Sequence, residues 1–296
     1  VALAYDVTGF FDNLDHSLLK MKLCELLAVP SLPSDVYAVF RSLIRYKRVD
    51  RDDVYAQFGI SKHNPRANGR RRICSSREFR YKVASKLLLP PPSNGTGIPQ
   101  GTPISALLSN LYMLDFDRAV NSQINAWGGL YRRYCDDILC VVPPKHAKAA
   151  EELIETKIAD MKLAVQPDKK GRFPFDDQGT LLSPPLQYLG LTFDGSSILL
   201  RGGGIARFYS RMRGGVRAAA SSRNRVAKKL GISADKVAIK NGKLLEKYSY
   251  AGKRNFITYA LRAAKITNAP KIKRQVSRHL AAIKREIQAK NKRSGT

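Results

Sequence analysis

Two adjacent aspartates lie inside an apolar, strand-like stretch at residues 131–142, which reads YRRYCDDILCVV. Aspartate is depleted in strands and neighbouring carboxylates repel each other, so Asp136 and Asp137 restrict what this segment can become. For the stretch taken alone, the simplest interpretation is a hairpin turn between two strands. The rest of the chain decides whether the pair does more than turn the backbone.

The 296-residue chain is strongly basic, with 52 Lys and Arg, 24 Asp and Glu and a net charge of +28. Residues 207–296 hold 25 Lys and Arg against three acidic residues, a net charge of +22 for that third. This asymmetry favours a nucleic-acid-binding module attached to a more balanced body. A membrane-surface role would also suit the charge, but the basic third lacks the apolar face of interfacial helices, and no run is apolar enough to span a membrane. The four cysteines form no CxxC pair. They are expected to be buried free thiols, as in a protein of the reducing cytoplasm.

The hydrophobic pattern predicts strands, helices and an insertion in a definite order. Residues 1–7 are predicted to form a buried strand that ends on Asp6, and Asp15 is predicted to cap a helix. The further expected elements are a helix over 36–46, an irregular basic insertion over 47–96, a helix that starts at Pro103 and includes Leu114, strands on both sides of Asp136 and Asp137, a helix over 147–161, a hairpin of residues 187–193 and 197–201, and basic helices after Gly204.

The inward faces of two helices are predicted from leucine and isoleucine spacing: Leu18, Leu19, Leu23, Leu26 and Leu27 after Asp15, and Ile104, Leu107, Leu108, Leu111 and Leu114 after Pro103. The order of the elements describes an α+β protein, with a split βαβ sheet followed by a helical domain. In such a sheet Asp6 and Asp136 are expected at neighbouring ends of adjacent strands.

Three carboxylates at one sheet edge are costly without cations, and oxygen ligands of this kind suit Mg²⁺. Two such ions, about 3.5–4 Å apart, can activate an attacking hydroxyl and stabilise a leaving pyrophosphate. A second element supports this chemistry. The turn containing Gly97, Pro99, Gln100 and Gly101 directly precedes a helix, where glycines allow close approach to a substrate and the Gln100 amide can donate to it. Alone, this turn is equally an ordinary loop into a helix.

Five segments occur in the order of polymerase motifs A to E: YDVTGFFDNLDHSLL, GIPQGTPISALLSNLYMLDFD, YCDDILCVV, QPDKK and LQYLGLTFDG. On these residues the chain resembles reverse transcriptases over about residues 1–201, and YCDD looks like their YxDD box. The long basic insertion and the amino-acid sequences of the second and fifth segments resemble those of bacterial defence-associated and abortive-infection reverse transcriptases. The chain resembles retron and group II intron enzymes more than it resembles retroviral ones.

The resemblance implies a role for individual residues. Asp6 and Asp136 would be the catalytic metal ligands for two Mg²⁺ ions, with Mn²⁺ as the alternative, and Asp137 would be a further ligand or an electrostatic support. Phe11 would exclude a ribose 2′-hydroxyl, with Phe10 as the competing candidate, and Gln100 and Gly101 would contact the nucleotide. Lys169 and Lys170 would assist pyrophosphate departure. Tyr188, Leu189 and Gly190 match the primer grip, and the nucleic-acid contacts would include Arg201, Arg207, Arg211 and Arg213. Core packing for either Phe, a solvated turn for the lysines and a purely structural hairpin remain the alternatives.

The resemblance also implies a right-hand polymerase palm over 1–185 with a fingers or RNA-binding insertion at 47–96, a primer-grip hairpin over 186–205 and a basic, all-helical thumb over 206–296. The fingers segment expected before Val1 is not in the sequence, so we expect further residues upstream. Too few acids follow residue 201 for an RNase H site.

The expected function is RNA-directed DNA polymerisation in the bacterial cytoplasm, with dNTPs, an RNA template (a companion non-coding RNA) and a DNA product as partners, in antiphage defence, with the oligomeric state left open. The alternatives are a retron or group II intron-type enzyme and an inactive RNA-binding scaffold.

Overall fold

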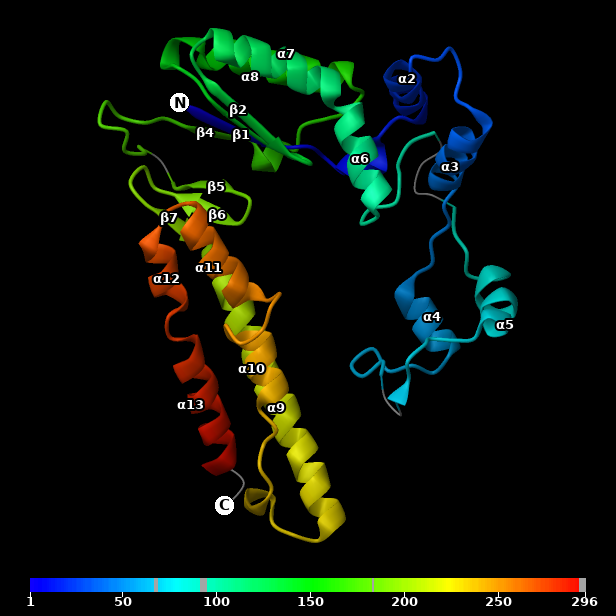
Figure 1. Cartoon of the computed structure of the whole chain (residues 1–296), viewed down its shortest axis with the longest axis vertical. Coiled ribbons are helices and arrows are strands. Elements are labelled where there is room, and N and C mark those ends of the chain that lie inside the picture. Colours follow the sequence, from blue (N-terminus) through cyan, green and yellow to red (C-terminus); the bar gives the residue numbers. More distant parts are fainter. Residues whose placement is uncertain (67–68, 91–94, 183, 293–296) are drawn as a thin grey trace. The chain divides into compact units, whose positions relative to one another are not determined.

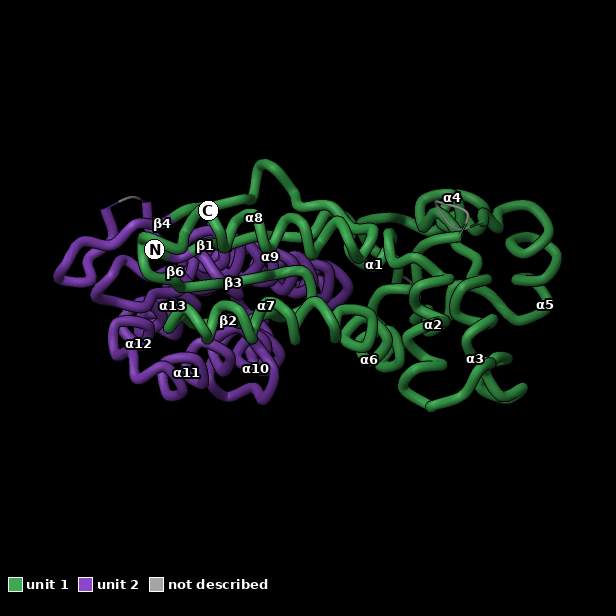
Figure 2. Tube along the Cα trace, turned by 90° about the horizontal axis from the view of Figure 1, so that it is seen from above, with its two compact units in different colours: residues 1, 3–172 green, residues 2, 173–296 purple. Residues whose placement is uncertain are grey.

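The computed structural model describes residues 1–66, 69–90, 95–182 and 184–292. Two compact units make up the chain (Figure 2): the first comprises Val1 and Leu3–Arg172, the second Ala2 and Phe173–Thr296. The division at residues 172 and 173 falls before the predicted end of the palm at residue 185.

A four-stranded sheet has the strand order β2-β3-β1-β4. Its strands are β1 (Ala2–Asp6), β2 (Leu130–Tyr134), β3 (Asp137–Val141) and β4 (Gly171–Phe173). Strand β3 is antiparallel to β2. It is also antiparallel to β1, because Val7 N donates to Asp136 O and Val142 N donates to Val1 O. Strands β1 and β2 are therefore parallel with β3 between them, which confirms the predicted split βαβ arrangement.

Helices α7 (Leu114–Ala126) and α8 (Ala147–Asp160) cover one face of this sheet (Figure 1). Successive strand residues point to opposite faces, so the buried Leu3 and Tyr5 of β1 and the buried Ile138 and Cys140 of β3 face the helices. They form one core with side chains from the two helices, namely Phe116, Val120, Ile124, Ile154 and Ile158. The same alternation directs Asp6 and Asp137 to the opposite face of the sheet.

The predicted N-cap at Asp15 is confirmed, because its carboxylate accepts a hydrogen bond from Leu18 N (2.8 Å) at the start of α2 (His16–Leu27). The predicted inward face of this helix is only partly right. Leu19 is fully buried, whereas Leu26 and Leu27 are exposed. Helix α2 follows the short α1 (Phe10–Asn13) and precedes α3 (Ser34–Ile44), the helix expected at 36–46.

The helix expected from Pro103 through Leu114 is two helices, α6 (Pro103–Tyr112) and α7, with a break at Met113. Asp115 and Asp117 lie in the first turn of α7, where carboxylates stabilise a helix N-terminus, and this favours the new start. Leu108 and Leu111 are buried as predicted, but Leu107 is 66% exposed.

The prediction that residues 47–96 are irregular is wrong in part. The segment contains α4 (Arg51–Gln57), capped by Asp50, and α5 (Ser76–Glu78), capped by Ser75, followed by a π-helix over Phe79–Ala84. Capping by Asp and Ser starts these helices despite the surrounding Gly and Pro. Residues 67–68 and 91–94 of this segment lie outside the described residues.

The second unit begins with a three-stranded antiparallel sheet of order β5-β6-β7, formed by Leu186–Tyr188, Leu191–Phe193 and Ile198–Leu200. Residues 187–193, predicted as one strand, are thus two strands. Leu189 (φ 49°) and Gly190 (φ 82°) form a two-residue turn, and two positive φ angles suit the twist of a tight hairpin.

Helices fill the remainder of this unit: α9 (Gly202–Leu230), α10 (Gly242–Tyr248), α11 (Phe256–Ile266), α12 (Pro270–Val276) and α13 (His279–Lys292). Phe208, Met212 and Val216 of α9 pack with Ile257, Ile272 and Ile283 in a second core. Residues 206–292 contain no strand, in agreement with the helical prediction for this part. Among the described residues, no helix is both long and apolar enough to cross a membrane.

Candidate active site

Asp6 and Asp137 lie directly opposite each other on neighbouring strands. Val1 and Val142 exchange two backbone hydrogen bonds (2.8 and 2.9 Å), and Val7 N donates to Asp136 O at 3.1 Å. Counting along the antiparallel ladder, the 6/137 pair is therefore a non-hydrogen-bonded pair. Cα atoms of such a pair are about 4.5 Å apart and their side chains are close. Two carboxylates separated by most of the first unit's sequence thus meet on the face of the sheet away from α7 and α8.

Asp136 occupies the tip of the β2–β3 hairpin. Tyr134 pairs with Asp137, so Cys135 and Asp136 are the two turn residues, and Cys135 has a left-handed φ of 54°. The interpretation of this stretch as a hairpin turn is therefore confirmed, and the interpretation as a carboxylate site stays a prediction. The turn places Asp136 beside Val7, which directly follows Asp6.

The charges of Asp6 and Asp136 affect the pKa of Asp137. Burial raises the pKa of Asp137, and the negative charges of Asp136 and Asp6 raise it further, while Lys169 acts in the opposite direction. Lys169 Nζ donates to Asp6 Oδ2 at 2.7 Å. This hydrogen bond, together with the charges of Asp6, Asp136 and Asp137, raises the pKa of Lys169. One cation of the chain thus already compensates part of the negative charge.

Lys169 and Lys170 point to different places. Lys170 forms an ion pair with Glu155 of α8, and its ammonium lies 5.8 Å from the centre of the Tyr5 ring. Tyr5 faces the helix-covered side of the sheet, so Lys170 is on that side and Lys169 is on the carboxylate side. Of the two lysines proposed to assist catalysis, the structure brings only Lys169 to the aspartates.

The donor set fits a divalent cation by its chemistry, because Asp6, Asp136 and Asp137 supply hard oxygen ligands whose mutual repulsion a cation would relieve. In the described residues, however, no group of three or more His, Cys, Asp or Glu side chains is already gathered as a metal site. One carboxylate oxygen of Asp6 forms an ion pair with Lys169. Metal binding therefore requires these side chains to turn toward a common point.

The two candidate sugar-gate residues differ in exposure. Phe10 is 3% exposed and packs in the core, whereas Phe11 is only partly buried and meets the Phe10 ring edge-on at a centroid distance of 5.3 Å. Phe11 O accepts a hydrogen bond from Ile98 N (2.9 Å), which ties it to the loop before α6. Phe11 is thus the one of the pair that a ligand can reach.

The loop with Gln100 and Gly101 is shaped by two left-handed glycines. Gly97 (φ 89°) packs so closely that a Cβ there would lie 2.9 Å from Asp12 O, whereas Gly101 (φ 91°) has open space around it. Ser105 Oγ donates to Pro99 O (2.5 Å), and Thr102 caps α6. Gln100 is exposed on this anchored loop.

The predicted primer-grip residues Tyr188, Leu189 and Gly190 form the end of β5 and the turn into β6. Tyr259 Oη of α11 donates to Leu189 O (3.3 Å), and Arg201 N donates to Gly190 O (3.0 Å). Leu189 is 41% exposed. The turn is therefore held by its own unit while its tip stays accessible.

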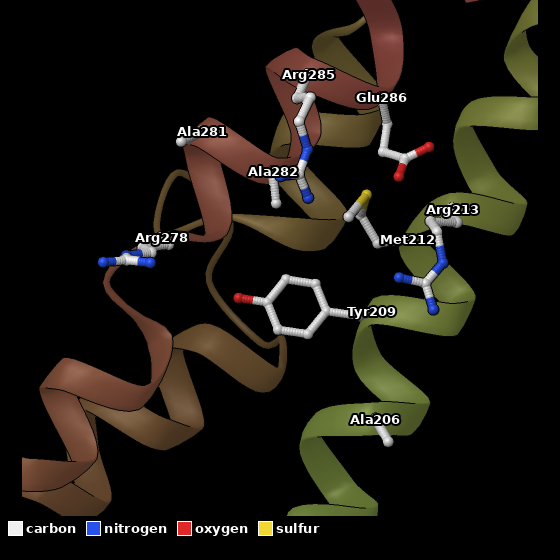
Figure 3. A pocket seen from close by; sticks show the side chains of 9 residues that line it. All are labelled: Ala206, Tyr209, Met212, Arg213, Arg278, Ala281, Ala282, Arg285 and Glu286. Carbon is white, nitrogen blue, oxygen red and sulfur yellow. The ribbon is translucent and has the colours of Figure 1, made fainter. Parts of the chain in front are cut away.

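The predicted nucleic-acid contacts Arg201, Arg207, Arg211 and Arg213 are all exposed and lie at the start of α9 or along it. Arg213 also lines a cavity of about 590 Å³ between α9 and α13 (Figure 3), together with Ala206, Tyr209, Met212, Arg278, Ala281, Ala282, Arg285 and Glu286. Three of the four charged residues in this lining are arginines, and the fourth is Glu286.

A partly buried polar network beside the hairpin is missing from the sequence-based prediction. Arg133 Nε and Nη2 donate to the two carboxylate oxygens of Asp117 (2.7 and 2.6 Å), and Tyr131 Oη donates to Asp117 Oδ1 (2.5 Å). Burial lowers the pKa of Arg133, but the hydrogen bond and charge of Asp117 outweigh this and raise it overall. The sequence offered one signal for this network: Arg133 is a charged residue two positions after Tyr131, in a half-buried strand.

The family model for reverse transcriptase (RNA-dependent DNA polymerase) matches residues 92–193 of this chain. The matched part includes the loop with Gln100, the hairpin with Asp136 and Asp137, and Lys169. Residues 92–193 are thus similar to a reverse transcriptase domain, in agreement with the palm-like α+β fold described above. No curated protein matches the sequence.

Among solved structures, the chain is similar to three telomerase structures. They are apo telomerase from Candida tropicalis truncated from its C-terminal domain (12% identity, TM-score 0.40, 68% of this chain and 35% of that one), apo telomerase from Candida tropicalis (13%, 0.39, 69% and 32%), and telomerase from Candida albicans in complex with a TWJ fragment of telomeric RNA (14%, 0.39, 98% and 47%). The chain spans between about a third and a half of these proteins.

Proposed function

We propose that the protein is an RNA-directed DNA polymerase that copies an RNA template into DNA. The observation that carries this proposal is the meeting of Asp6 with Asp136 and Asp137 across strands β1 and β3, in a chain whose residues 92–193 match reverse transcriptases. A hairpin turn alone does not account for a third carboxylate, Asp6, on the neighbouring strand β1. Metal binding by the three carboxylates does account for it.

Asp6, Asp136 and Asp137 are the residues that would hold two Mg²⁺ ions, or Mn²⁺ in their place. When bound, such ions would lower the pKa of a primer 3′-hydroxyl and offset negative charge on the departing pyrophosphate. The chain's own contribution is to hold Asp137 opposite Asp6 and to carry Asp136 on the adjacent turn.

Three further residues act on the incoming dNTP in this proposal. Lys169, already bonded to Asp6, supplies positive charge or a proton to the departing pyrophosphate. Phe11, the accessible member of the Phe10–Phe11 pair, excludes a 2′-hydroxyl. Gln100 donates from the loop anchored by Gly97 and Ser105.

The second unit binds the template and product in this proposal. Its helices carry most of the chain's excess positive charge, and the arginines of α9 are exposed. Phosphate contacts from such residues give affinity that is independent of sequence and falls steeply with salt.

The biological setting we propose is bacterial antiphage defence with a companion non-coding RNA as template, because the motif wording resembles defence-associated enzymes. The test is protection of cells against phage by the wild-type gene and by its Asp136→Ala, Asp137→Ala variant. Loss of protection in the variant is expected. Sequencing of co-purifying nucleic acid separates this role from that of a retron or group II intron-type enzyme, since each copies a different RNA.

A non-catalytic RNA-binding scaffold is the second candidate, favoured by the Lys169–Asp6 ion pair and by the lack of a gathered metal site in the described residues. Primer extension on an RNA template with dNTPs and Mg²⁺ decides between the two. We expect extension by the wild type and none by the Asp136→Ala, Asp137→Ala variant, with RNA binding retained by both. If both proteins bind RNA and neither extends a primer, the scaffold is the correct function.

A further inference from the structure

Arg133 contacts the hairpin tip as well as Asp117. Its Nη1 donates to Cys135 O at 2.8 Å, and its Nη2 also donates to Asn110 Oδ1 of α6 at 3.3 Å. With the two bonds to Asp117, the guanidinium thus binds α6, α7 and the turn at once. Its side chain is 6% exposed, so the bonds to Asp117 and Cys135 are partly shielded from water, whereas the bond to Asn110 is at the surface.

The bond to Cys135 O fixes the peptide plane that precedes Asp136. The peptide plane that follows Asp136 is fixed from the other side, because Asp136 O accepts from Val7 N of the Asp6 strand end. Cys135 itself has the left-handed φ of 54°, a backbone region that a non-glycine residue adopts only when its surroundings hold it there. On the hairpin side, the hydrogen bond from Arg133 Nη1 to Cys135 O is the contact that holds this backbone conformation.

We propose that Arg133, oriented by Asp117 and Asn110, is a positioning residue that fixes the backbone on the N-terminal side of Asp136 and so sets the geometry in which Asp136 and Asp6 bind a divalent cation. This inference rests on the proposed function. A lysine at position 133 would keep the charge, but it cannot form the side-on pair with Asp117 and reach the Cys135 carbonyl at the same time.

A purely structural role would predict only lost stability, and the chain offers a matched control for that. Asp115 lies two residues before Asp117 on α7 and pairs with Lys22, whose side chain is 10% exposed, but has no bond to the hairpin. Arg133→Lys and Asp117→Asn therefore disturb a partly buried ion pair that reaches the turn. Asp115→Asn disturbs an ion pair of the same helix that does not reach the turn, with Lys22 10% and Asp115 49% exposed.

The experiment measures Mn²⁺ binding by electron paramagnetic resonance and the Mg²⁺ midpoint of primer extension in wild type and the three variants. For Arg133→Lys we expect both midpoints to rise at least fivefold, with activity largely restored at saturating Mg²⁺ and the KM for dNTP within twofold of wild type. Asp117→Asn, which keeps the side-chain shape, should shift the midpoints at least twofold in the same direction. Asp115→Asn should lower the melting temperature and leave both midpoints within twofold.

Unchanged midpoints in Arg133→Lys and Asp117→Asn, or an equal shift in Asp115→Asn, would overturn the positioning role while the proposed function stands. If Arg133→Lys does not fold, Asp117→Asn alone gives the same decision. A folded wild-type protein that neither binds Mn²⁺ nor extends primers would overturn the proposed function, and this inference with it.

Discussion

Lys169 Nζ lies 2.7 Å from Asp6 Oδ2, although 163 residues separate them in the sequence. The neighbouring Lys170 is bonded to Glu155 instead. A short 3₁₀ turn over Pro167–Lys169 gives the two adjacent lysines opposite directions. Only Lys169 therefore lies beside the aspartates, where the proposed function puts the departing pyrophosphate.

Replacement of Lys169 by Met should therefore lower the rate of primer extension by about 10²-fold, the lower end of the effect of a positioned proton donor. Lys170→Met should stay within about threefold of wild type and cost at most about 1 kcal/mol of stability, since its ion pair is partly exposed. Single-turnover extension and thermal melting measure the two effects. Equal rate losses in both variants would show that the side-chain directions do not matter.

Phe11→Val should admit ribonucleotides, because the accessible ring is the one proposed to exclude a 2′-hydroxyl. Phe10→Val should instead lower the free energy of unfolding by about 2 kcal/mol, as expected when a buried ring is truncated, with sugar discrimination unchanged. Incorporation of rNTP against dNTP, with chemical denaturation alongside, checks both. No gain of rNTP incorporation in either variant would remove the sugar gate.

Gly97→Ala should destabilise the protein more than Gly101→Ala. Both glycines have left-handed φ angles, and alanine there costs about 1–2 kcal/mol. Only at position 97 would the added Cβ also meet Asp12 O, at 2.9 Å, which adds at least about 1 kcal/mol. Denaturant unfolding measures the difference. Equal losses would mean that the Asp12 backbone gives way without cost.

The double variant Arg207→Ala, Arg211→Ala should weaken RNA binding and reduce the slope of log affinity against log salt by up to about 2, one for each phosphate contact. Lys148→Ala, an exposed residue of α8 in the first unit, is the control and should leave the slope unchanged. Binding titrations at several salt concentrations check this. A slope that stays the same in the double variant would place the phosphate contacts elsewhere.

The central part of the fold could be predicted because local signals agree there with tertiary packing. Asp15 caps its helix, strands flank Asp136, and the order of the elements yields the split βαβ sheet. Polymerase-like motif order then suggested which carboxylates meet. The adjacency of Asp6 to the hairpin follows from sheet order rather than from any local pattern.

Other features depend on interactions that no sequence window contains. The break at Met113 and the left-handed turn at Leu189 interrupt runs that look continuous in hydrophobicity. The partners of Arg133 come from two helices as well as from the hairpin, so its role could not be assigned before these elements were placed. The different directions of Lys169 and Lys170 likewise arise from one short turn.

The measurement that tests the central claim most directly is the rate of Mg²⁺-dependent primer extension in Asp6→Asn, Asp136→Asn and the double variant, each shown to be folded. If the two carboxylates act as one site, each single change should lower the rate at least about 10³-fold, and the double change should be no worse than either, because residues that act as a unit are not additive. A single variant that retains more than a tenth of the wild-type rate would contradict the account.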